Sequence, residues 1–361
     1  MVLWERIRYQ ESAVGALREA HAHGRLAHAY LFWGLAGVGK LRAAVAFAQT
    51  LMCNAGGAAA PCGQCRSCEQ VARLTHPDLH IVLPARRGEE TQKAIEEYAR
   101  DPYHCLEISP GASIGIERVR GLKVESSKAR VETGSRVIIL RDAERMTIEA
   151  AQAALKLIEE PHAETYLALT CRDPAQLLPT IVSRCQRLRF RPLPQAFIEK
   201  ALGEACEADQ EQVRLISGLA RGSLGRALQM CGQDLVAVRR AALELFERPL
   251  GDAAQVAERV RAVERTWDGR SARATIDLLM SWYADVLAVS QGVEGGAITH
   301  TDLRGALQRR AQRITVGEIR RRIDILEELA GAIERNVNPG LALQEALTRI
   351  HRIEGTEPRQ A

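Results

Sequence analysis

A short apolar strand, a glycine-rich loop and an apolar helix follow one another near the start of the chain, and this order restricts the fold more than any other feature. The predicted strand covers Ala29–Trp33, and the predicted helix runs from about Lys40 to Met52. In loops of the pattern G-x-x-x-x-G-K-[ST], backbone N–H groups and the helix amino terminus hold phosphate oxygens, and the lysine reaches the terminal phosphates. The sequence therefore predicts a nucleotide-binding loop, with a strand-to-helix turn that binds nothing as the alternative. The candidate cofactor-binding residues are Gly34, Gly37, Gly39 and Lys40.

Two positions near this loop lack the groups that hold a magnesium ion. The loop pattern ends in a serine or threonine whose hydroxyl binds Mg²⁺, but position 41 is leucine. A second metal ligand normally follows an apolar strand as the first of two acidic residues, and here that position is Arg141, followed by Asp142. Leucine offers no ligand and arginine repels a divalent cation, so hydrolysis of a nucleotide at this site is not expected. The remaining loop residues still allow ATP to bind without being hydrolysed.

Strand-like and helical segments alternate up to about residue 190, and only helical segments follow. Strands that alternate with helices form parallel sheets with crossover helices. The sequence therefore predicts an α/β core followed by helical regions. The charged stretch at 85–112 is interpreted as a surface excursion that is partly helical. Further strands are predicted at 80–83, 136–140, 167–170 and 188–190, and helices at 116–126 and 148–159.

The overall composition is typical of a globular protein without a membrane segment. The chain has 49 basic and 45 acidic residues, and a net charge of +4 is too small to indicate a nucleic-acid-binding protein by itself. The amino terminus is charged where a signal peptide would be apolar, and no apolar run approaches the length of a membrane span. A cytoplasmic location without a membrane partner is expected. In a reducing cytosol, metal binding or burial accounts better than disulfides for the nine cysteines.

Four of these cysteines lie close together directly after the loop helix. The spacing C-x8-C-x2-C-x2-C suits a tetrahedral zinc site, and four thiolates leave no open position for chemistry, so the expected role of Zn²⁺ is structural. An iron–sulfur cluster and unliganded cysteines are the alternatives. The other five cysteines, at 105, 171, 185, 206 and 231, are interpreted as small buried or part-buried residues. The candidate metal ligands are Cys53, Cys62, Cys65 and Cys68.

A serine-arginine-cysteine triplet at 183–185 carries a resemblance to a known family. It is preceded by ALKLIEEP at 154–161, and the chain also contains GRLAHAYLFWGLAGVGK, HPDLHIVLP and DAERM. In this combination the chain resembles the bacterial DNA polymerase III clamp-loader family, a branch of the AAA+ ATPases. In that family the arginine of the triplet reaches the ATP of a neighbouring subunit. The resemblance therefore implies that Arg184 acts in trans, where a guanidinium stabilises the γ-phosphate during hydrolysis.

The resemblance also implies a division into domains. A nucleotide-sensing arginine is expected in the second domain at position 225, which is glycine here, and Arg226 lies one residue later. One residue is a rotation of about 100° on a helix, so Arg226 would not point toward the nucleotide. The implied domains are an AAA+ core with the cysteine module 53–68 at residues 1–190, a helical lid at 191–243, a helical collar at 244–352 and a disordered tail at 353–361.

The departures at Leu41, Arg141 and Gly225 together predict a non-hydrolysing member of this family. Such a subunit would help to load the sliding clamp onto primed DNA and would donate Arg184 as an arginine finger, without being a catalyst itself. The implied partners are the other loader subunits, namely the gamma/tau ATPases and delta, with the clamp and primer-template DNA reached through the assembly. An active ATPase subunit of the same loader and a stand-alone nucleotide-binding enzyme are the alternatives.

Overall fold

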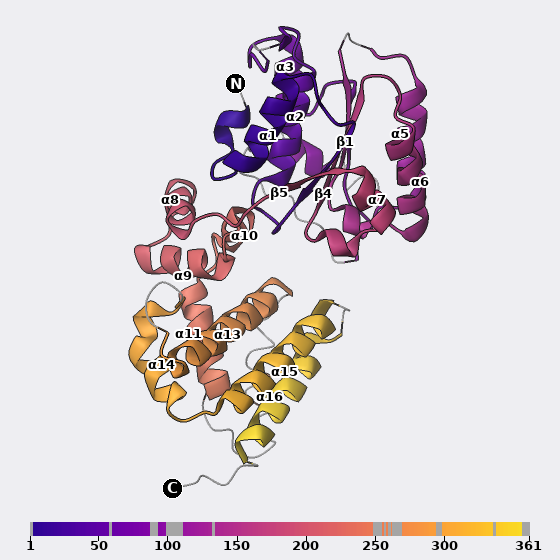
Figure 1. Ribbon diagram of the computed structural model, residues 1–361. Helices are drawn as coiled ribbons and strands as arrows, with labels where there is room; N and C mark the ends of the chain where they lie inside the picture. The colour runs from indigo at the N-terminus through magenta and orange to yellow at the C-terminus, as the bar shows by residue number, and fades with distance from the viewer. Residues whose placement is uncertain are drawn as a thin grey trace. The chain divides into compact units, whose positions relative to one another are not determined.

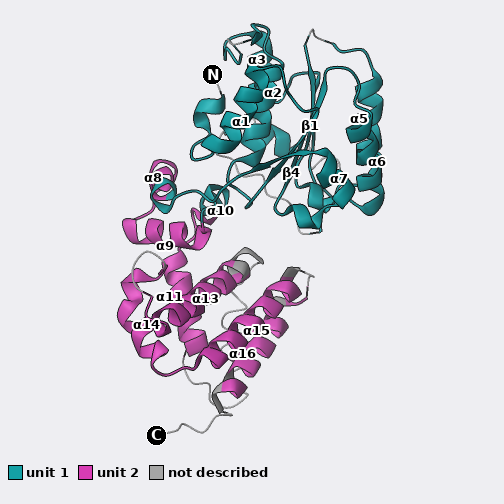
Figure 2. Ribbon diagram, viewed as in Figure 1, with its two compact units in different colours: residues 1–198, 222–229 teal, residues 199–221, 230–361 magenta. Residues whose placement is uncertain are grey.

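The computed structural model describes most of the chain, which forms two compact units. The first unit comprises residues 1–198 and 222–229, and the second comprises 199–221 and 230–361 (Figure 2). No helix among the described residues is long and apolar enough to cross a membrane. The described residues are 3–57, 60–86, 93–98, 111–131, 134–247, 255, 258, 261, 269–293, 298–334 and 337–355.

The first unit contains a five-stranded sheet in which neighbouring strands are parallel, in the order β2-β3-β4-β1-β5 (Figure 1). Strands β3, β4 and β1 lie inside the sheet and are almost entirely apolar, as expected for parallel strands that are covered on both faces. In the register, Leu31 of β1 lies opposite Leu169 of β4 and Arg187 of β5. The strands are β1 (Ala29–Trp33), β2 (Leu79–Val82), β3 (Arg136–Leu140), β4 (Thr165–Cys171) and β5 (Gln186–Arg189).

Helices cover both faces of this sheet. Tyr30 and Phe32 of β1 belong to the apolar core beneath α1 and α2, and Leu31 belongs to the core beneath α5, α6 and α7. Successive strand side chains point to opposite faces, so the one strand that carries the glycine-rich loop is fixed from both sides. The helices of this unit include α1 (Glu11–Ala22), α2 (Lys40–Leu51), α3 (Arg66–Ala72), α5 (Ile116–Ser127), α6 (Ile148–Glu159), α7 (Pro179–Arg184) and α10 (Leu224–Met230).

The predicted α/β class is confirmed. Each strand and helix predicted between Ala29 and Phe190 is present, and its ends agree with the structure to within two residues. Of the charged stretch 85–112, the structure describes 85–86, 93–98 and 111–112, and residues 93–98 are helical as predicted. The tail predicted from 353 is wrong for its first residues, because the last helix continues to Gly355; residues 356–361 lie outside the described part of the chain.

The second unit consists of helices packed around an apolar core. Trp282 and Tyr283 of α13, Leu326 of α15 and Leu347 of α16 are among its buried side chains. Because α13, α15 and α16 each bury an apolar face against the others, the helical character predicted for this region is also confirmed. The helices are α8 (Gln195–Ala205), of which residues from 199 belong here, α9 (Gln210–Ala220), α11 (Leu235–Glu247), α13 (Gly269–Ser290), α14 (Arg304–Ala311), α15 (Val316–Glu334) and α16 (Pro339–Gly355).

Buried polar groups fix connections between these helices. Asp285 of α13 accepts hydrogen bonds from the N–H groups of Thr299 and His300 at 2.9 and 2.7 Å, so it holds the chain that enters α14. His300 is fully buried, and burial together with the charge of Arg239 lowers the pKa of His300 to about 4. His300 is therefore neutral at pH 7, and it packs edge-on against the Trp282 ring.

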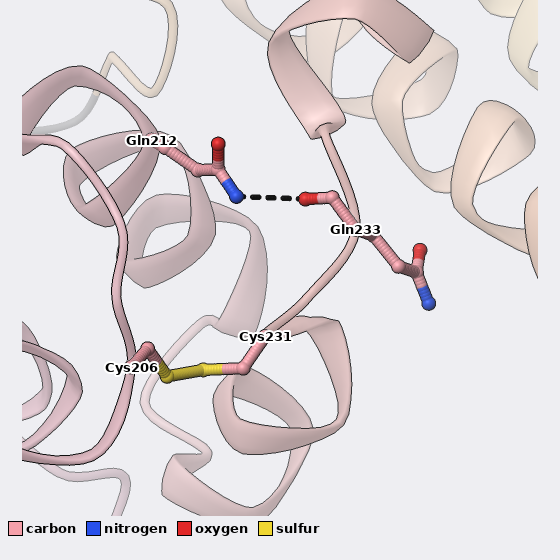
Figure 3. The surroundings of a disulfide bond; sticks show 4 residues. All are labelled: Cys206, Gln212, Cys231 and Gln233. Carbon is pink, nitrogen blue, oxygen red and sulfur yellow. Dashed lines mark hydrogen bonds between the residues drawn. A yellow bond between two sulfur atoms is a disulfide. The ribbon is translucent and has the colours of Figure 1, made fainter.

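A disulfide joins Cys206 to Cys231 in the second unit (Figure 3). Both cysteines are part-buried, as predicted. The expectation that burial or metal binding, and not a disulfide, accounts for the cysteines is wrong for this pair, because the fold brings the residue after α8 and the residue after α10 to a Cα separation of 6.1 Å. A second tie lies beside the bond, where the Gln212 side chain donates to the Gln233 carbonyl at 2.7 Å (Figure 3). Cys171 and Cys185 are buried free thiols, as predicted, and Cys105 lies outside the described residues.

Replacing both disulfide cysteines, as in Cys206→Ser/Cys231→Ser, is expected to lower the free energy of unfolding of the second unit. The bond spans a sequence separation of 25 residues. The chain-entropy estimate for a loop of that size is about 3 kcal/mol, since the cross-link restricts the unfolded chain. Urea unfolding followed by circular dichroism under non-reducing conditions measures the difference. A reductant should lower the free energy of unfolding of the unsubstituted chain to that of the variant. Equal free energies of unfolding without reductant would contradict the expectation.

Candidate functional site

The glycine-rich loop follows the carboxyl end of β1 and enters α2. Gly34 has φ +139°, and a Cβ atom at this position would lie 2.2 Å from the Phe190 carbonyl oxygen, so only glycine fits. Gly39 has φ +103° and stands directly before Lys40, the first residue of α2. The backbone at both positions is of the kind that glycine alone adopts readily. The predicted order of strand, loop and helix is therefore confirmed.

The start of α10 lies against this loop within the first unit. The Gly225 N–H donates to the Gly37 carbonyl at 3.0 Å, and a Cβ atom on Gly37 would lie 2.4 Å from the Ser223 hydroxyl oxygen. Position 225 thus contributes a backbone hydrogen bond where the resemblance led us to expect a nucleotide-sensing arginine. Because Gly37 has no side chain, α10 can lie against the loop. The packing of α10 therefore explains why position 37 is glycine, without any role in binding phosphate.

Gln10, which stands before α1, fixes the same region from another side. It is buried, and its Nε2 donates to the carbonyl oxygens of Val38 and Arg191 at 3.4 and 2.8 Å. Its Oε1 accepts the Arg191 N–H at 2.9 Å. The side chain therefore connects the loop to the segment that leaves β5. This role could not be predicted, since no local pattern in the sequence distinguishes Gln10 from a surface glutamine.

The Lys40 side chain turns into the loop. Its ammonium donates to the carbonyl oxygens of Gly34 and Leu35 at 2.6 and 2.8 Å, and the residue is only 6% exposed. Burial lowers the pKa of Lys40 to about 8, and the nearby charges of Asp142 and Glu144 oppose this shift. In this conformation the lysine satisfies the backbone of its own loop.

The position expected to bind magnesium holds an ion pair between neighbouring residues. Nε of Arg141 lies 3.6 Å from Oδ2 of Asp142, directly after β3. The Asp142 N–H donates to the Thr170 hydroxyl at 2.9 Å, and Asp142 adopts a left-handed backbone conformation. Because the guanidinium already balances this carboxylate, a divalent cation would have to displace or oppose it. Thr170 is a further site residue that the sequence analysis missed.

Glu144 lies in the same group of strand ends. Its Oε1 accepts the Arg172 N–H at 3.1 Å, and burial raises the pKa of Glu144. Asp142 and Glu144 are both partly buried. The buried thiol of Cys171 lies close enough to Glu144 and Lys40 for their charges to affect its pKa, which burial raises to about 12.

Arg184, the proposed arginine finger, lies at the other edge of the sheet. It is the last residue of α7 and precedes β5, in which Gln186 is opposite Tyr30 near the amino end of β1. The loop and Lys40 follow the carboxyl end of β1, so Arg184 and Lys40 are at opposite edges of a parallel sheet. The Arg184 side chain is 43% exposed, and its Nε contacts Glu159 Oε1 at 2.8 Å. Its Nη1 donates to the Thr180 carbonyl at 3.2 Å.

The four clustered cysteines form a group that could hold a metal ion. Their Sγ atoms all lie within 4.8 Å of one another, and those of Cys62 and Cys68 are 4.0 Å apart. Backbone N–H groups of Cys62, Cys65 and Cys68 point at the sulfurs of Cys53, Cys62 and Cys65 at 3.3 to 3.4 Å, an arrangement that stabilises thiolates. The Gln49 side chain donates to the Cys68 carbonyl at 3.1 Å, which attaches this module to α2.

These features define a class of protein: an α/β fold with a loop of the phosphate-binding pattern whose lysine and glycines make contacts within the chain. The family described as "DNA polymerase III, delta subunit" matches residues 9–194, and that described as "DNA polymerase III, delta subunit, C terminal" matches 251–352. The DNA polymerase III subunit delta' of Bacillus subtilis is 30% identical over 323 residues, which cover 87% of this chain and 88% of that protein. The chain therefore belongs to the delta-prime family of DNA polymerase III clamp-loader subunits.

Similarity extends to a second kind of loader subunit. The DNA polymerase III subunit gamma/tau of Mycobacterium tuberculosis is 30% identical over 200 residues, which cover 55% of this chain and 30% of that protein. A solved structure of a DNA polymerase III gamma subunit-related protein from Thermotoga maritima has a TM-score of 0.44 and 17% identity, and the match covers 94% of this chain and 99% of that one.

The buried ammonium of Lys40 predicts a pH-dependent difference between the unsubstituted chain and Lys40→Met. Folding lowers the pKa of Lys40 to about 8, so the unfolded chain holds this proton more tightly. Below pH 8 the charged lysine therefore costs stability, and the cost disappears as pH rises to about 10.5. The stability of the unsubstituted chain should rise by roughly 3 kcal/mol relative to Lys40→Met between pH 7 and 10.5. Chemical unfolding across this pH range measures the free energy of unfolding of both proteins. A difference between them that does not change with pH would contradict the burial of a charged lysine.

Proposed function

We propose that this chain is a non-hydrolysing subunit of the bacterial clamp loader, which helps to place the sliding clamp on primed DNA. The observation that carries the proposal is the Arg141–Asp142 ion pair at the position where an active site would bind magnesium. Leu41 removes the other protein ligand of the metal. Without either ligand, the charge that develops on the γ-phosphate during hydrolysis would lack its main electrostatic support.

The closed loop supports the same conclusion. An active lysine releases its ammonium to the β- and γ-phosphates, whereas Lys40 is bonded to the Gly34 and Leu35 carbonyls. The contact of Gly225 with Gly37 holds α10 against the loop. An active ATPase subunit is the main alternative, and the similarity to gamma/tau subunits favours it. The substitutions at Leu41 and Arg141 count against it. ATP binding without turnover is compatible with the loop and would require Lys40 to leave its present partners.

The position of Arg184 supports a role toward a neighbouring subunit. Since it lies at the opposite sheet edge from Lys40, it is badly placed to serve the loop of its own chain. It is exposed, and within the described residues its Nη2 makes no hydrogen bond. A planar guanidinium on the surface, oriented by Glu159 and the Thr180 carbonyl, suits donation of hydrogen bonds to phosphate oxygens of a partner's ATP.

We further propose that the four clustered cysteines hold a structural zinc ion. Tetrahedral zinc with Zn–S bonds near 2.3 Å places sulfurs about 3.8 Å apart, close to the separation of Cys62 and Cys68. Four thiolates and the N–H groups directed at them satisfy such an ion without an open position. The site would stabilise the connection between α2 and α3 and would take no part in chemistry.

The domain boundaries and the partners are proposed from the family resemblance. We propose a core at residues 1–190, a lid at 191–243 and a collar at 244–352 that joins other loader subunits, among them gamma/tau and delta. The clamp and primer-template DNA would be reached through this assembly in the cytoplasm. The long amphipathic helices of the second unit suit an assembly surface better than a substrate pocket.

In the reconstituted loader, Arg184→Ala should slow ATP hydrolysis at the one site that this arginine serves. Arginine fingers accelerate such reactions by roughly 1000-fold or more, so a single-turnover experiment should show one class of ATP that is hydrolysed very slowly. Arg184→Lys should recover little of the rate, because an ammonium lacks the planar fork. The purified chain alone should hydrolyse no more ATP than its Lys40→Ala variant.

The matched control is Arg187→Ala, which removes another exposed arginine three residues further on. Unchanged hydrolysis in the Arg184→Ala loader, with normal assembly on gel filtration, would overturn the arginine-finger role. Lysine-dependent hydrolysis by the isolated chain would instead assign it to the active ATPase subunits.

The purified chain should contain about one zinc ion, and Cys62→Ser should lose it. Three thiolates leave an incomplete tetrahedron, which binds zinc much more weakly. Elemental analysis by mass spectrometry measures the stoichiometry. Cys206→Ser/Cys231→Ser is the control, because it removes two sulfurs outside the cluster and should retain the metal. Iron with inorganic sulfide in the purified chain would assign a cluster in place of zinc.

A further inference from the structure

Arginines are concentrated in one stretch of the second unit that contains two consecutive helices. Between 304 and 322 the chain carries seven arginines, no lysine and one acidic residue, Glu318. The stretch covers α14, a four-residue connection and the first two turns of α15. The whole chain has a net charge of only +4, so this segment is much more basic than the rest.

Five of these arginines are exposed, and four of the five, Arg309, Arg313, Arg320 and Arg321, are called the arginine surface here. Among the described residues, none of the four has an acidic partner within ion-pair distance. Their neighbour Arg310 differs, since its Nε contacts Glu247 at 2.7 Å. The charges of the arginine surface are therefore not balanced inside the second unit.

Glu318, the one acidic residue of the segment, caps a helix and does not pair with the arginines. Oε2 of Glu318 accepts hydrogen bonds from the Thr315 N–H and hydroxyl at 2.7 and 3.0 Å, and the Glu318 N–H donates to the Thr315 hydroxyl at 3.2 Å. This is a capping box that begins α15. Asp324 lies one turn beyond Arg320 and Arg321 on α15, and it forms no ion pair with either of them.

Helix stability does not account for the whole arginine surface. Arg309 lies at the carboxyl end of α14, where a positive charge interacts favourably with the helix dipole. Arg320 and Arg321 lie in the second turn of α15, beyond the first turn in which the helix dipole acts, so the dipole gives no reason for positive charge there. Four exposed arginines within thirteen residues of sequence, without acidic partners among the described residues, are compatible with a ligand outside this segment.

We propose that the arginine surface binds the phosphate backbone of nucleic acid. A guanidinium forms paired hydrogen bonds with phosphate oxygens, and a series of unpaired arginines is the usual feature of such a surface. The other exposed residues between Arg309 and Arg320 are Gln312, Thr315 and Gly317, none of which has a large apolar side chain. No aromatic residue occurs between 304 and 322, so bases have nothing to stack on. Binding is therefore directed at phosphates and is independent of sequence. This inference does not depend on Arg184 or on the phosphate loop.

The test measures binding of the full chain to a fluorescein-labelled 30-nucleotide oligo(dT) and to a 30-base-pair duplex, by anisotropy between 50 and 200 mM salt. Two variants, Arg309→Gln/Arg313→Gln and Arg320→Gln/Arg321→Gln, each remove two charges. Each should weaken binding by about tenfold and reduce the slope of log K against log salt by about 1.4 for the single strand and about 1.8 for the duplex. The control, Arg18→Gln/Arg214→Gln, removes two exposed arginines of α1 and α9 and should leave both values nearly unchanged.

The two probes distinguish a single-stranded template from a duplex as the source of the phosphates. Equal losses in the control and the two variants, or no binding by the unsubstituted chain, would overturn the proposal. Thermal unfolding of each variant identifies any that fail to fold, and Arg320→Lys/Arg321→Lys should then retain most of the salt dependence. Unchanged DNA affinity together with weaker assembly into the loader would assign the arginine surface to an acidic partner subunit and would also overturn the proposal.

Discussion

The approach of Gly34 to the Phe190 carbonyl is the contact on which the geometry of the first unit depends. A Cβ atom there would lie 2.2 Å from the oxygen, so the loop can cross the end of β5 only because this residue is glycine. The contact places the loop over the sheet edge. Gln10 then ties the loop to the segment after β5, and α10 lies against Gly37. Gly34 and Gly37 are therefore required by the packing of the protein around them, whereas Gly39 is favoured by its positive φ alone.

The charges at this edge form a balanced set without a metal ion. Lys40 and Arg141 supply the positive charges, and Asp142 and Glu144 supply the negative ones. In an ATPase of this fold, magnesium and phosphate would enter the same space with charges of opposite sign. In this chain the Arg141 guanidinium lies beside the Asp142 carboxylate, and the Lys40 ammonium donates to two carbonyl oxygens of its own loop. Both positive charges therefore have partners within the protein.

The sequence predicted correctly those features that depend on a local pattern of residues. Buried parallel strands appear as continuous apolar runs, so β1 and β3 could be located closely, and the spacing from Cys53 to Cys68 was sufficient to predict that four sulfurs meet. Residues that act through contacts between distant segments could not be found in this way. Gln10 bonds to Arg191, which lies 181 positions further along the chain, and Cys206 pairs with Cys231 only because α8 and α10 end near each other. The arginine surface was visible as composition, but its exposure and lack of partners required the structure.

The internal contacts of the glycine-rich loop bear on the orientation of Arg184, the residue proposed to act on a partner subunit. Arg184 is held by Glu159 of α6 and by the Thr180 carbonyl of α7. It is followed closely by β5, which leads to Phe190, whose carbonyl lies next to Gly34. In an ATPase that responds to its own nucleotide, movement of the loop would pass along this strand to the arginine. With Lys40 and Gly37 bonded internally, no nucleotide is needed to position the loop, so Arg184 would keep one orientation throughout the partner's ATP cycle. The proposed absence of hydrolysis and the proposed role of Arg184 are then compatible with each other, because a group presented to a partner is most effective when it is already in place.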